Sequence, residues 1–233
     1  MQHSLSAQAV TFLVVGKRHV YTQTDNSTTA DASNPWRFDA HIEGTSSTTD
    51  LSGITTPTLG LAGGTGSNTL TYNSGDNAWQ VQASYSSQTL LDAAYANGDY
   101  SLTALTQTVS GISLTGNTYP AAPLATNLSG GTIVGGILSW NVAQALTITI
   151  TGTADHMGIS VDGNSYNGNT ESFGVGTISF TVPALSMTSG NSYTVSLDFD
   201  DIVSGTNVFA YSGTGGMSSA KYAGIYSAQT TFA

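Results

Sequence analysis

The chain of 233 residues contains no cysteine and very little charge. Without cysteine it has no disulfide and no thiolate for catalysis or metal binding. Asp, Glu, Lys and Arg make up only 8% of the residues, against about 25% in a typical globular domain. Ser, Thr, Asn, Gln and Gly must therefore cover most of the surface, and this composition favours strands and turns over long helices.

Basic residues are especially scarce. Four of them, Lys17, Arg18, Arg37 and Lys221, stand against 14 acidic residues, and the net charge is −10. A surface that neutralises about six phosphates would need more cations than this chain contains, so we expect no nucleic-acid partner. We also expect no membrane insertion, because no apolar run approaches the roughly 18 residues that cross a bilayer.

Short segments that alternate between apolar and polar residues recur at intervals of roughly 10 residues, a pattern typical of sandwiches and barrels. The clearest covers residues 36–43, where Trp36, Phe38, Ala40 and Ile42 share one face. Residues 10–15, 19–24 and 100–109 also indicate strands. The sequence therefore predicts an all-β fold.

One segment breaks this pattern and predicts a short helix near residues 87–97. Its apolar residues are spaced as one stripe of a helix. Ser86 or Ser87 is the expected N-cap, and Gly98 is the residue expected just past the C-terminus. From the length we expect two abutting antiparallel β-sandwich domains, residues 1–110 with the helix and residues 111–233.

The second half resembles fibronectin type III and immunoglobulin-like domains of secreted bacterial proteins. Residues 120–123 (Pro-Ala-Ala-Pro) resemble the proline-rich start, and residues 138–140 (Leu-Ser-Trp) resemble the second strand with its core tryptophan. Residues 187–193 are similar to the tyrosine corner. The resemblance implies that the Tyr193 hydroxyl bonds to backbone within residues 182–191, and that loops are inserted near residues 162–174 and 204–220.

Carboxylates gather at two places that could hold a metal ion. Asp198, Asp200 and Asp201 form the densest acidic cluster, and such a cluster suits a structural Ca²⁺. Asp39, His41 and Glu43 share one face of a strand, where they could bind a metal or simply form the solvated face opposite Trp36, Phe38 and Ile42. For both groups the solvated interpretation is the simpler alternative, and we expect no other cofactor.

No catalytic residue is assigned from the sequence. There are two glutamates, Glu43 and Glu171, and neither lies in a context typical of a glycosidase carboxylate pair. There is no Gly-x-Ser-x-Gly nucleophile motif. We therefore expect a protein that is not an enzyme.

Aromatic side chains are the candidate ligand-binding residues, because sugar rings stack on them while Asn, Gln and Ser bond sugar hydroxyls. The candidates are Trp79, Tyr85, Tyr222 and Tyr226. Packing in the core is the alternative, and it is favoured for Trp79 and Tyr85.

Together these observations predict a secreted, non-enzymatic structural or adhesive protein at the cell surface or outside the cell. Ala7 and Ala9 match the end of a signal peptide. The apolar segment 10–15 could pair with a sheet edge of its own chain or of another copy. A carbohydrate-binding module is the first alternative, and a polysaccharide-degrading sandwich enzyme the second. The expected partner is a second copy or an extracellular glycan or surface.

Overall fold

The computed structural model describes residues 10–44, 51, 52, 54, 56–163, 166–206, 208 and 220–232. Strands account for 64% of these described residues and helix for 5%. The predicted all-β class with one short helix is confirmed. No helix in these residues is long and apolar enough to cross a membrane.

The chain forms two compact units, and each is assembled from three separate segments. Unit 1 comprises Met1–Lys17, Trp36–Thr118 and Ile202–Tyr226, and unit 2 comprises Arg18–Pro35, Tyr119–Asp201 and Ser227–Ala233. Three long strands, β1 (Val10–Thr24), β17 (Tyr193–Gly205) and β18 (Lys221–Phe232), contribute residues to both. The sequence predicted a single boundary between residues 110 and 111, whereas the chain passes between the two units at several points.

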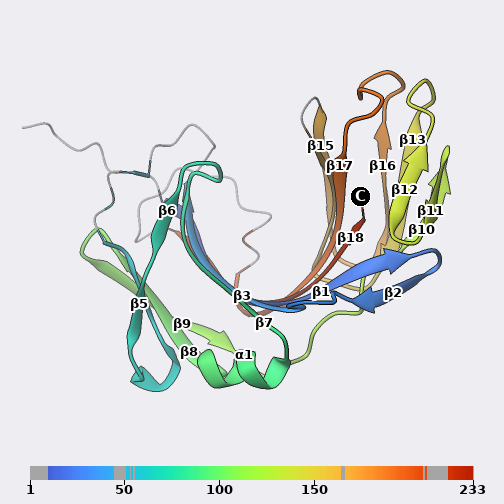
Figure 1. Ribbon diagram of the computed structural model, residues 1–233. Helices are drawn as coiled ribbons and strands as arrows, with labels where there is room; N and C mark the ends of the chain where they lie inside the picture. The colour runs from blue at the N-terminus through green and yellow to red at the C-terminus, as the bar shows by residue number, and fades with distance from the viewer. Residues whose placement is uncertain are drawn as a thin grey trace, which may run out of the picture. The chain divides into compact units, whose positions relative to one another are not determined.

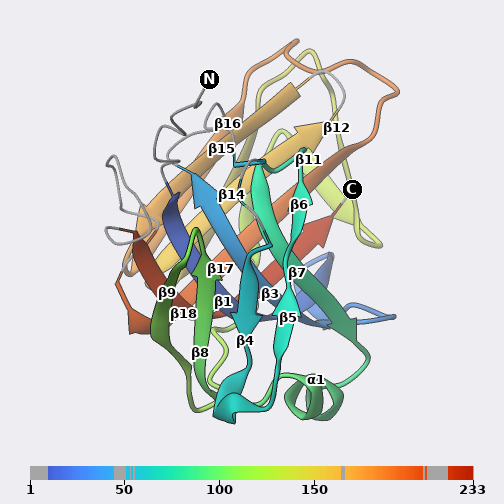
Figure 2. The ribbon, with the colours of Figure 1, turned by 90° about the vertical axis from the view of Figure 1, so that its left-hand side faces the viewer.

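Unit 1 is built from two sheets and the helix (Figures 1 and 2). In one sheet, β17, β18 and β1 are followed by β3 (Trp36–Gly44), β7 (Ala78–Tyr85) and β6 (Thr71–Asn73). The other has the order β5 (Ser67–Thr69), β4 (Thr58–Gly60), β8 (Gly98–Ala104) and β9 (Gln107–Leu114). A 3-10 turn η1 (Ala62–Gly64) and helix α1 (Gln88–Ala94) complete it.

The two sheets of unit 1 share an aromatic and aliphatic core. Phe38 of β3 stacks on Tyr95 with ring centroids 3.7 Å apart, and it lies 5.8 Å from the ring of Tyr100 in β8. Ala40 and Ile42 follow Phe38 on the same buried face, as the alternation predicted.

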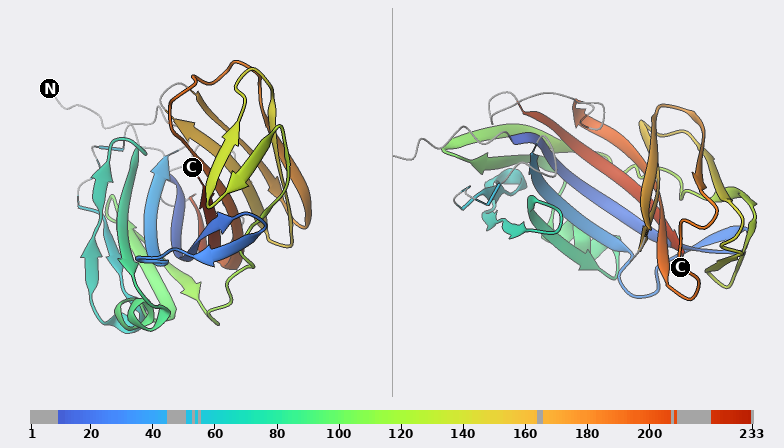
Figure 3. Two further views of the ribbon diagram at one scale, coloured as in Figure 1. Left: turned by 45° about the vertical axis from the view of Figure 1, so that its right-hand side comes forward. Right: turned by 90° about the horizontal axis from the view of Figure 1, so that it is seen from above.

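Unit 2 is a sandwich of two facing layers (Figures 1 and 3). One layer has the order β15 (Tyr166–Phe173), β14 (His156–Gly163), β17, β18 and β1, with β2 (Ser27–Ala30) paired to β1. The other has the order β10 (Ala125–Ser129), β13 (Leu146–Gly152) and β16 (Gly176–Val182). A hairpin of β11 (Gly131–Val134) and β12 (Ile137–Trp140) forms a separate two-stranded sheet. Their inward side chains form one hydrophobic core, which includes Ile148, Ile150, Ile159, Val161, Val195 and Leu197.

Tyr193 occupies the position that the tyrosine-corner pattern predicts. It begins β17, its side chain is buried, and its hydroxyl accepts a hydrogen bond from the Thr188 backbone N–H at 2.8 Å. The predicted bond to backbone within residues 182–191 is therefore confirmed. Trp140, by contrast, lies at the end of the two-stranded sheet and not in β13. Its side chain packs on the core, with its ring edge-on to that of Tyr193 and the ring centroids 6.3 Å apart.

Helix α1 begins where the sequence predicted and ends earlier. Ser87 is the N-cap, and its hydroxyl accepts from the Leu90 N–H at 3.3 Å. Tyr95 is the C-cap, and Gly98 is the first residue of β8. Gly98 therefore lies three residues beyond the C-cap, with a φ of 141° that favours glycine, and it begins the next strand.

Two further segments differ from their predictions. Residues 100–109 belong to a hairpin and not to one strand, because Leu105 and Thr106 adopt φ values of 50° and 67° between β8 and β9. Left-handed turn positions usually hold Gly or Asn, so this turn left no signal in the sequence. Residues 162–174 are not an inserted loop, since β15 spans Tyr166–Phe173. Most of the loop expected at 204–220 lies outside the described residues.

Residues 10–15 belong to an interior strand. In unit 1, β1 lies between β18 and β3 in the same sheet. Its first half therefore already pairs with its own chain on both edges. A donor strand for a second copy must have a free edge to offer, so this segment does not meet that role.

Candidate functional site

The candidate site with the most chemistry surrounds Lys17, in unit 1. Side chains alternate along β1, so Leu13, Val15 and Lys17 share one face, and all three are buried. The Lys17 side chain has 0% exposure. Burying an ammonium group is costly unless charge and hydrogen bonds compensate, so its partners define the site.

The groups around Lys17 come from helix α1, from two loops and from strand β18. Lys17 Nζ lies 2.5 Å from Asp92 Oδ1 and 2.8 Å from Asn97 Oδ1. Tyr226 donates its hydroxyl to Asn97 Oδ1 at 2.9 Å. Asn97 Nδ2 donates to Asn117 Oδ1 at 3.0 Å, and Asn117 Nδ2 donates to Asp92 Oδ2 at 2.8 Å. We call Lys17, Asp92, Asn97, Asn117 and Tyr226 the lysine network.

The electrostatics of the lysine network reflect the burial of Lys17 and Tyr226. Burial lowers the pKa of Lys17, and the hydrogen bond and negative charge of Asp92 oppose that shift. Burial raises the pKa of Tyr226 and that of neighbouring Tyr100, so both phenols stay protonated. The network thus places an amine, a carboxylate, a carboxamide and a phenol in direct contact.

A second cluster of polar groups lies in unit 2, around Asp200. His156 Nδ1 lies 2.7 Å from Asp200 Oδ2, and Ser227 Oγ donates to Asp200 Oδ1 at 2.5 Å. All three side chains are buried. In a nucleophilic triad the serine hydroxyl forms a hydrogen bond with the histidine, whereas the Ser227 hydroxyl donates to the aspartate. The cluster therefore serves as an internal polar contact between β14, β17 and β18.

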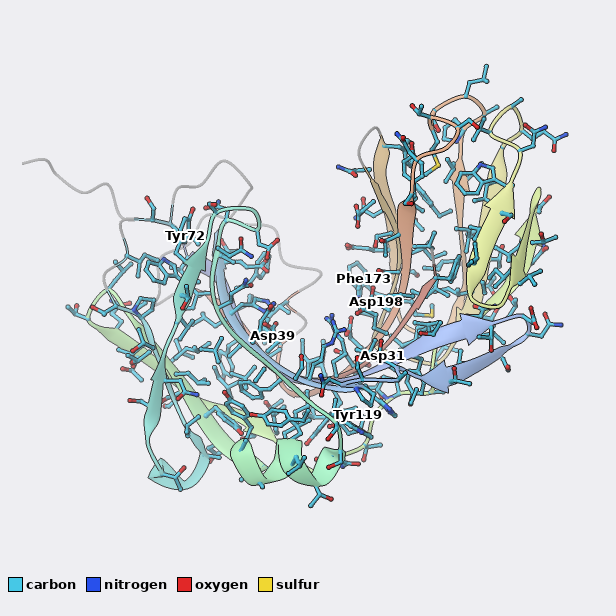
Figure 4. The ribbon with its side chains drawn as sticks, in the orientation of Figure 1. Asp31, Asp39, Tyr72, Tyr119, Phe173 and Asp198 are labelled. Atoms are coloured by element: carbon cyan, nitrogen blue, oxygen red, sulfur yellow. The ribbon has the colours of Figure 1, made fainter. Side chains whose placement is uncertain are left out.

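The structure does not bring the three aspartates of the predicted calcium site together. Asp198 and Asp200 point to one face of β17, while Asp201 points to the other face, because strand side chains alternate. Asp198, labelled in Figure 4, accepts a hydrogen bond from Gln229 Nε2 at 2.9 Å. Burial raises the pKa of Asp198 to about 6. Across the described residues, no group of three His, Asp or Glu side chains is arranged to hold a metal ion.

His41 lies between the two carboxylates predicted with it in β3. Its Nδ1 is 2.6 Å from Asp39 Oδ2, and its Nε2 is 3.3 Å from Glu43 Oε1 (Asp39 is labelled in Figure 4). Both ring nitrogens therefore face carboxylate oxygens of the same strand. This arrangement is a row of polar contacts along one strand and not a shared coordination sphere.

The four aromatic candidates differ in what they can offer a ligand. Trp79 and Tyr85 lie directly opposite Ile42 and Trp36, and the Trp79 indole N–H donates to the Leu51 carbonyl at 2.7 Å. They are partly buried on the core side of β7, as the core alternative predicted. Tyr222 is also partly buried.

Tyr226 is completely buried and belongs to the lysine network. Its ring therefore has no face for sugar stacking, and that prediction for Tyr226 is corrected.

A regular row of hydroxyl groups covers the outer face of β13 and β16 in unit 2. Thr147 faces Thr181, Thr149 faces Ser179, and Thr151 faces Thr177. Their hydroxyl oxygens lie 2.9, 2.7 and 2.8 Å apart. We call these six residues the hydroxyl ladder. Successive rungs are about 7 Å apart along strands about 4.8 Å apart, which makes a flat, neutral and ordered surface.

The lysine network and the hydroxyl ladder were not identified from the sequence. Lys17 stands beside Arg18 and after Gly16, a combination that indicates a break between strands. The alternation of Leu13, Val15 and Lys17 was the available signal for a buried lysine. The ladder had a signal too, since residues 147–151 read Thr-Ile-Thr-Ile-Thr.

Similarity to known proteins adds no assignment to these sites: no protein-family model matches the chain, and no curated protein sequence matches it.

Proposed function

We propose that this is a secreted, non-enzymatic adhesive or structural protein, and that the hydroxyl ladder of unit 2 is its contact surface for an extracellular polysaccharide. The ladder is the single observation that carries the proposal. Each hydroxyl is both donor and acceptor, so an ordered row of them matches the uncharged hydroxyls of a polysaccharide. Asn127 and Ser129 of β10 extend the surface, because they pair with Thr149 and Thr147.

The low density of charged residues supports this kind of partner. Only 8% of the residues carry charge, so little electrostatic attraction draws the chain to ionic surfaces. Binding to a neutral solid then depends on shape and on many weak hydrogen bonds. Export is consistent with the Ala7 and Ala9 pattern, which lies outside the described residues.

An immunoglobulin-like identity for unit 2 is part of the same proposal, and the strand order supports it. Immunoglobulin domains join their first, second and fifth strands in one sheet and their third, sixth and seventh in the other. Unit 2 joins β10, β13 and β16 in one layer and β14, β17 and β18 in the other, with β15 beside β14. The buried Tyr193 at the start of β17 is in the place of the tyrosine corner. Such modules act as spacers and binding platforms.

The test is a pull-down with insoluble cellulose and chitin, comparing the wild type with a ladder variant. Thr151→Lys combined with Thr177→Lys replaces an exposed rung by two like charges. The matched control is Thr103→Lys with Thr108→Lys, since these two residues form the same kind of exposed hydroxyl pair, 2.8 Å apart, in unit 1. We expect the ladder variant to bind about tenfold more weakly, a loss of about 1.4 kcal/mol, and the control to bind as the wild type does. Equal retention of both variants, or no binding by the wild type, would refute the proposal.

Self-association through a sheet edge is the second candidate, and β15 is the strand that favours it. In the described part of the chain β15 pairs with β14 alone. Asn169 is exposed on this strand, and a lysine on an edge strand blocks pairing with another chain. Sedimentation velocity at high concentration should show oligomers for the wild type and monomers for Asn169→Lys. If both the wild type and Asn169→Lys sediment as monomers, self-association through β15 is excluded.

A further inference from the structure

We propose that the lysine network of unit 1 forms an intramolecular isopeptide bond between Lys17 Nζ and Asn97 Cγ, catalysed by the chain itself. Nucleophile, acceptor, acid–base group and oxyanion donor are all present, each in contact with its neighbour. The bond would link β1 to the loop after α1. This modification is independent of the proposed adhesive function.

The nucleophile already lies next to the bond it would attack. Lys17 Nζ is 2.8 Å from Asn97 Oδ1, and that oxygen is bonded to Cγ at about 1.2 Å, so Nζ and Cγ are at most about 4 Å apart. Attack geometries begin at about 3–3.5 Å. A small rotation of the carboxamide therefore brings the reacting atoms together.

Asp92 can carry the protons that the reaction must move. Its Oδ1 is 2.5 Å from Lys17 Nζ, so it can take a proton from the ammonium group and leave a neutral amine with a free electron pair. That pair forms the Nζ–Cγ bond. Nζ gives up a second proton when the Cγ–Nδ2 bond breaks. The leaving nitrogen takes both protons by way of Asp92 and departs as ammonium, and Asp92 is again a carboxylate.

Tyr226 supplies the stabilisation that the intermediate needs. Attack on Cγ places negative charge on Asn97 Oδ1, and the Tyr226 hydroxyl already donates to that oxygen at 2.9 Å. Fixed donors aimed at a developing oxyanion lower such barriers strongly. Tyr226 has 0% exposure, so water does not compete for its hydroxyl.

Burial favours the neutral amine that the attack requires. The Lys17 side chain has 0% exposure, and burial is the largest influence on its pKa, which is lowered. The leaving side of the acceptor is open, because Asn97 is an exposed residue and its Nδ2 bonds Asn117 near the surface. The amine is therefore buried while the ammonium product has a way out.

The wild-type protein itself provides the first test, since the chain has only four Lys and Arg residues. Trypsin digestion in urea releases residues 1–17 as a free peptide if Lys17 is unmodified. A linked Lys17 is not cleaved, and the segment 1–18 then stays attached to the fragment 38–221. Mass spectrometry should show this linked pair, lighter than the sum of its parts by one ammonia, with the link at Asn97. Release of residues 1–17 in full would overturn the proposal.

Three variants separate the isopeptide bond from other losses of ammonia. Asn97 precedes Gly98, and an Asn-Gly pair can lose ammonia by closing a succinimide on its own backbone. That product would persist in Lys17→Met and would hold no second peptide. Lys17→Met, Asn97→Ala and Asp92→Asn should all abolish the linked pair. A linked pair lighter by one water would instead place the bond on Asp92 and overturn Asn97 as the acceptor, as would a linked pair that survives Asn97→Ala.

Discussion

Asp198 makes a definite prediction about how stability depends on pH. Burial raises its pKa from 3.8 to about 6, the negative Asp200 adds to the shift, and the charge of Arg18 opposes it. The folded state thus holds this proton more tightly than the unfolded state does. Between about pH 4 and pH 6 the folded state binds more protons, so the contribution of Asp198 to stability falls as the pH rises.

The size of the effect follows from the shift of roughly two pKa units, each equivalent to about 1.4 kcal/mol. Because the residue keeps some exposure, we expect about 2 kcal/mol. Asp198→Asn retains an oxygen for Gln229 and cannot ionise. It should match the wild type at pH 4 and exceed its free energy of unfolding by about 2 kcal/mol at pH 8.

Urea denaturation at several pH values between 4 and 8 measures this difference directly, and subtracting the two curves cancels the titration of groups that do not interact with Asp198. Asp162→Asn is the matched control, since Asp162 is an exposed aspartate of the same layer. The difference between Asp198→Asn and the wild type should change more with pH than the difference between Asp162→Asn and the wild type. A constant difference for Asp198→Asn, or a variant that is less stable than the wild type at pH 8, would refute the reasoning.

Three further substitutions test contacts that the structure defines. Tyr193→Phe removes the acceptor of the Thr188 N–H and should cost about 1–2 kcal/mol in urea denaturation, whereas Tyr193→Ala should cost about 3–5 kcal/mol through the cavity it leaves; unchanged stability of Tyr193→Ala would contradict the buried corner. Gly163→Ala places a Cβ 2.2 Å from the Tyr193 ring and should cost about 1–3 kcal/mol by the same measurement, and a neutral result would mean that the ring is not held there. Ser87→Ala should cost about 1 kcal/mol through loss of the helix cap, while Ser86→Ala, which removes no cap, should leave the thermal midpoint unchanged; equal effects would exclude Ser87 as the cap.

Local patterns in the sequence predicted the local structure well. The alternation over residues 36–43 identified β3 and its buried face, because a strand with one buried side must place apolar residues at every second position. The choice between Ser86 and Ser87 as cap was left open, and only backbone geometry settles it. Tyr193 was identified because a tyrosine corner combines a turn glycine with a fixed spacing.

The candidate sites were harder to predict because their residues are distant in the chain. Lys17 and Asp92 are 75 residues apart, and Lys17 and Asn97 are 80 apart. No local sequence pattern indicates a contact between residues so far apart in the chain. Single residues also misled the interpretation: Tyr226 was a candidate for sugar stacking, whereas residues 223–228 of β18 are buried on both faces of the strand.

The segmented construction of both units has a consequence for how the protein is made. Unit 1 includes residues up to Tyr226 and unit 2 includes residues up to Phe232, so neither unit can be completed before β18 has been synthesised. A chain grows at about 5–20 residues per second, and it must spend that whole time with unfinished sheets. We therefore expect neither unit to fold before β18 has left the ribosome. Truncation anywhere before Lys221 would leave both units short of a strand, so a premature stop should yield no folded half.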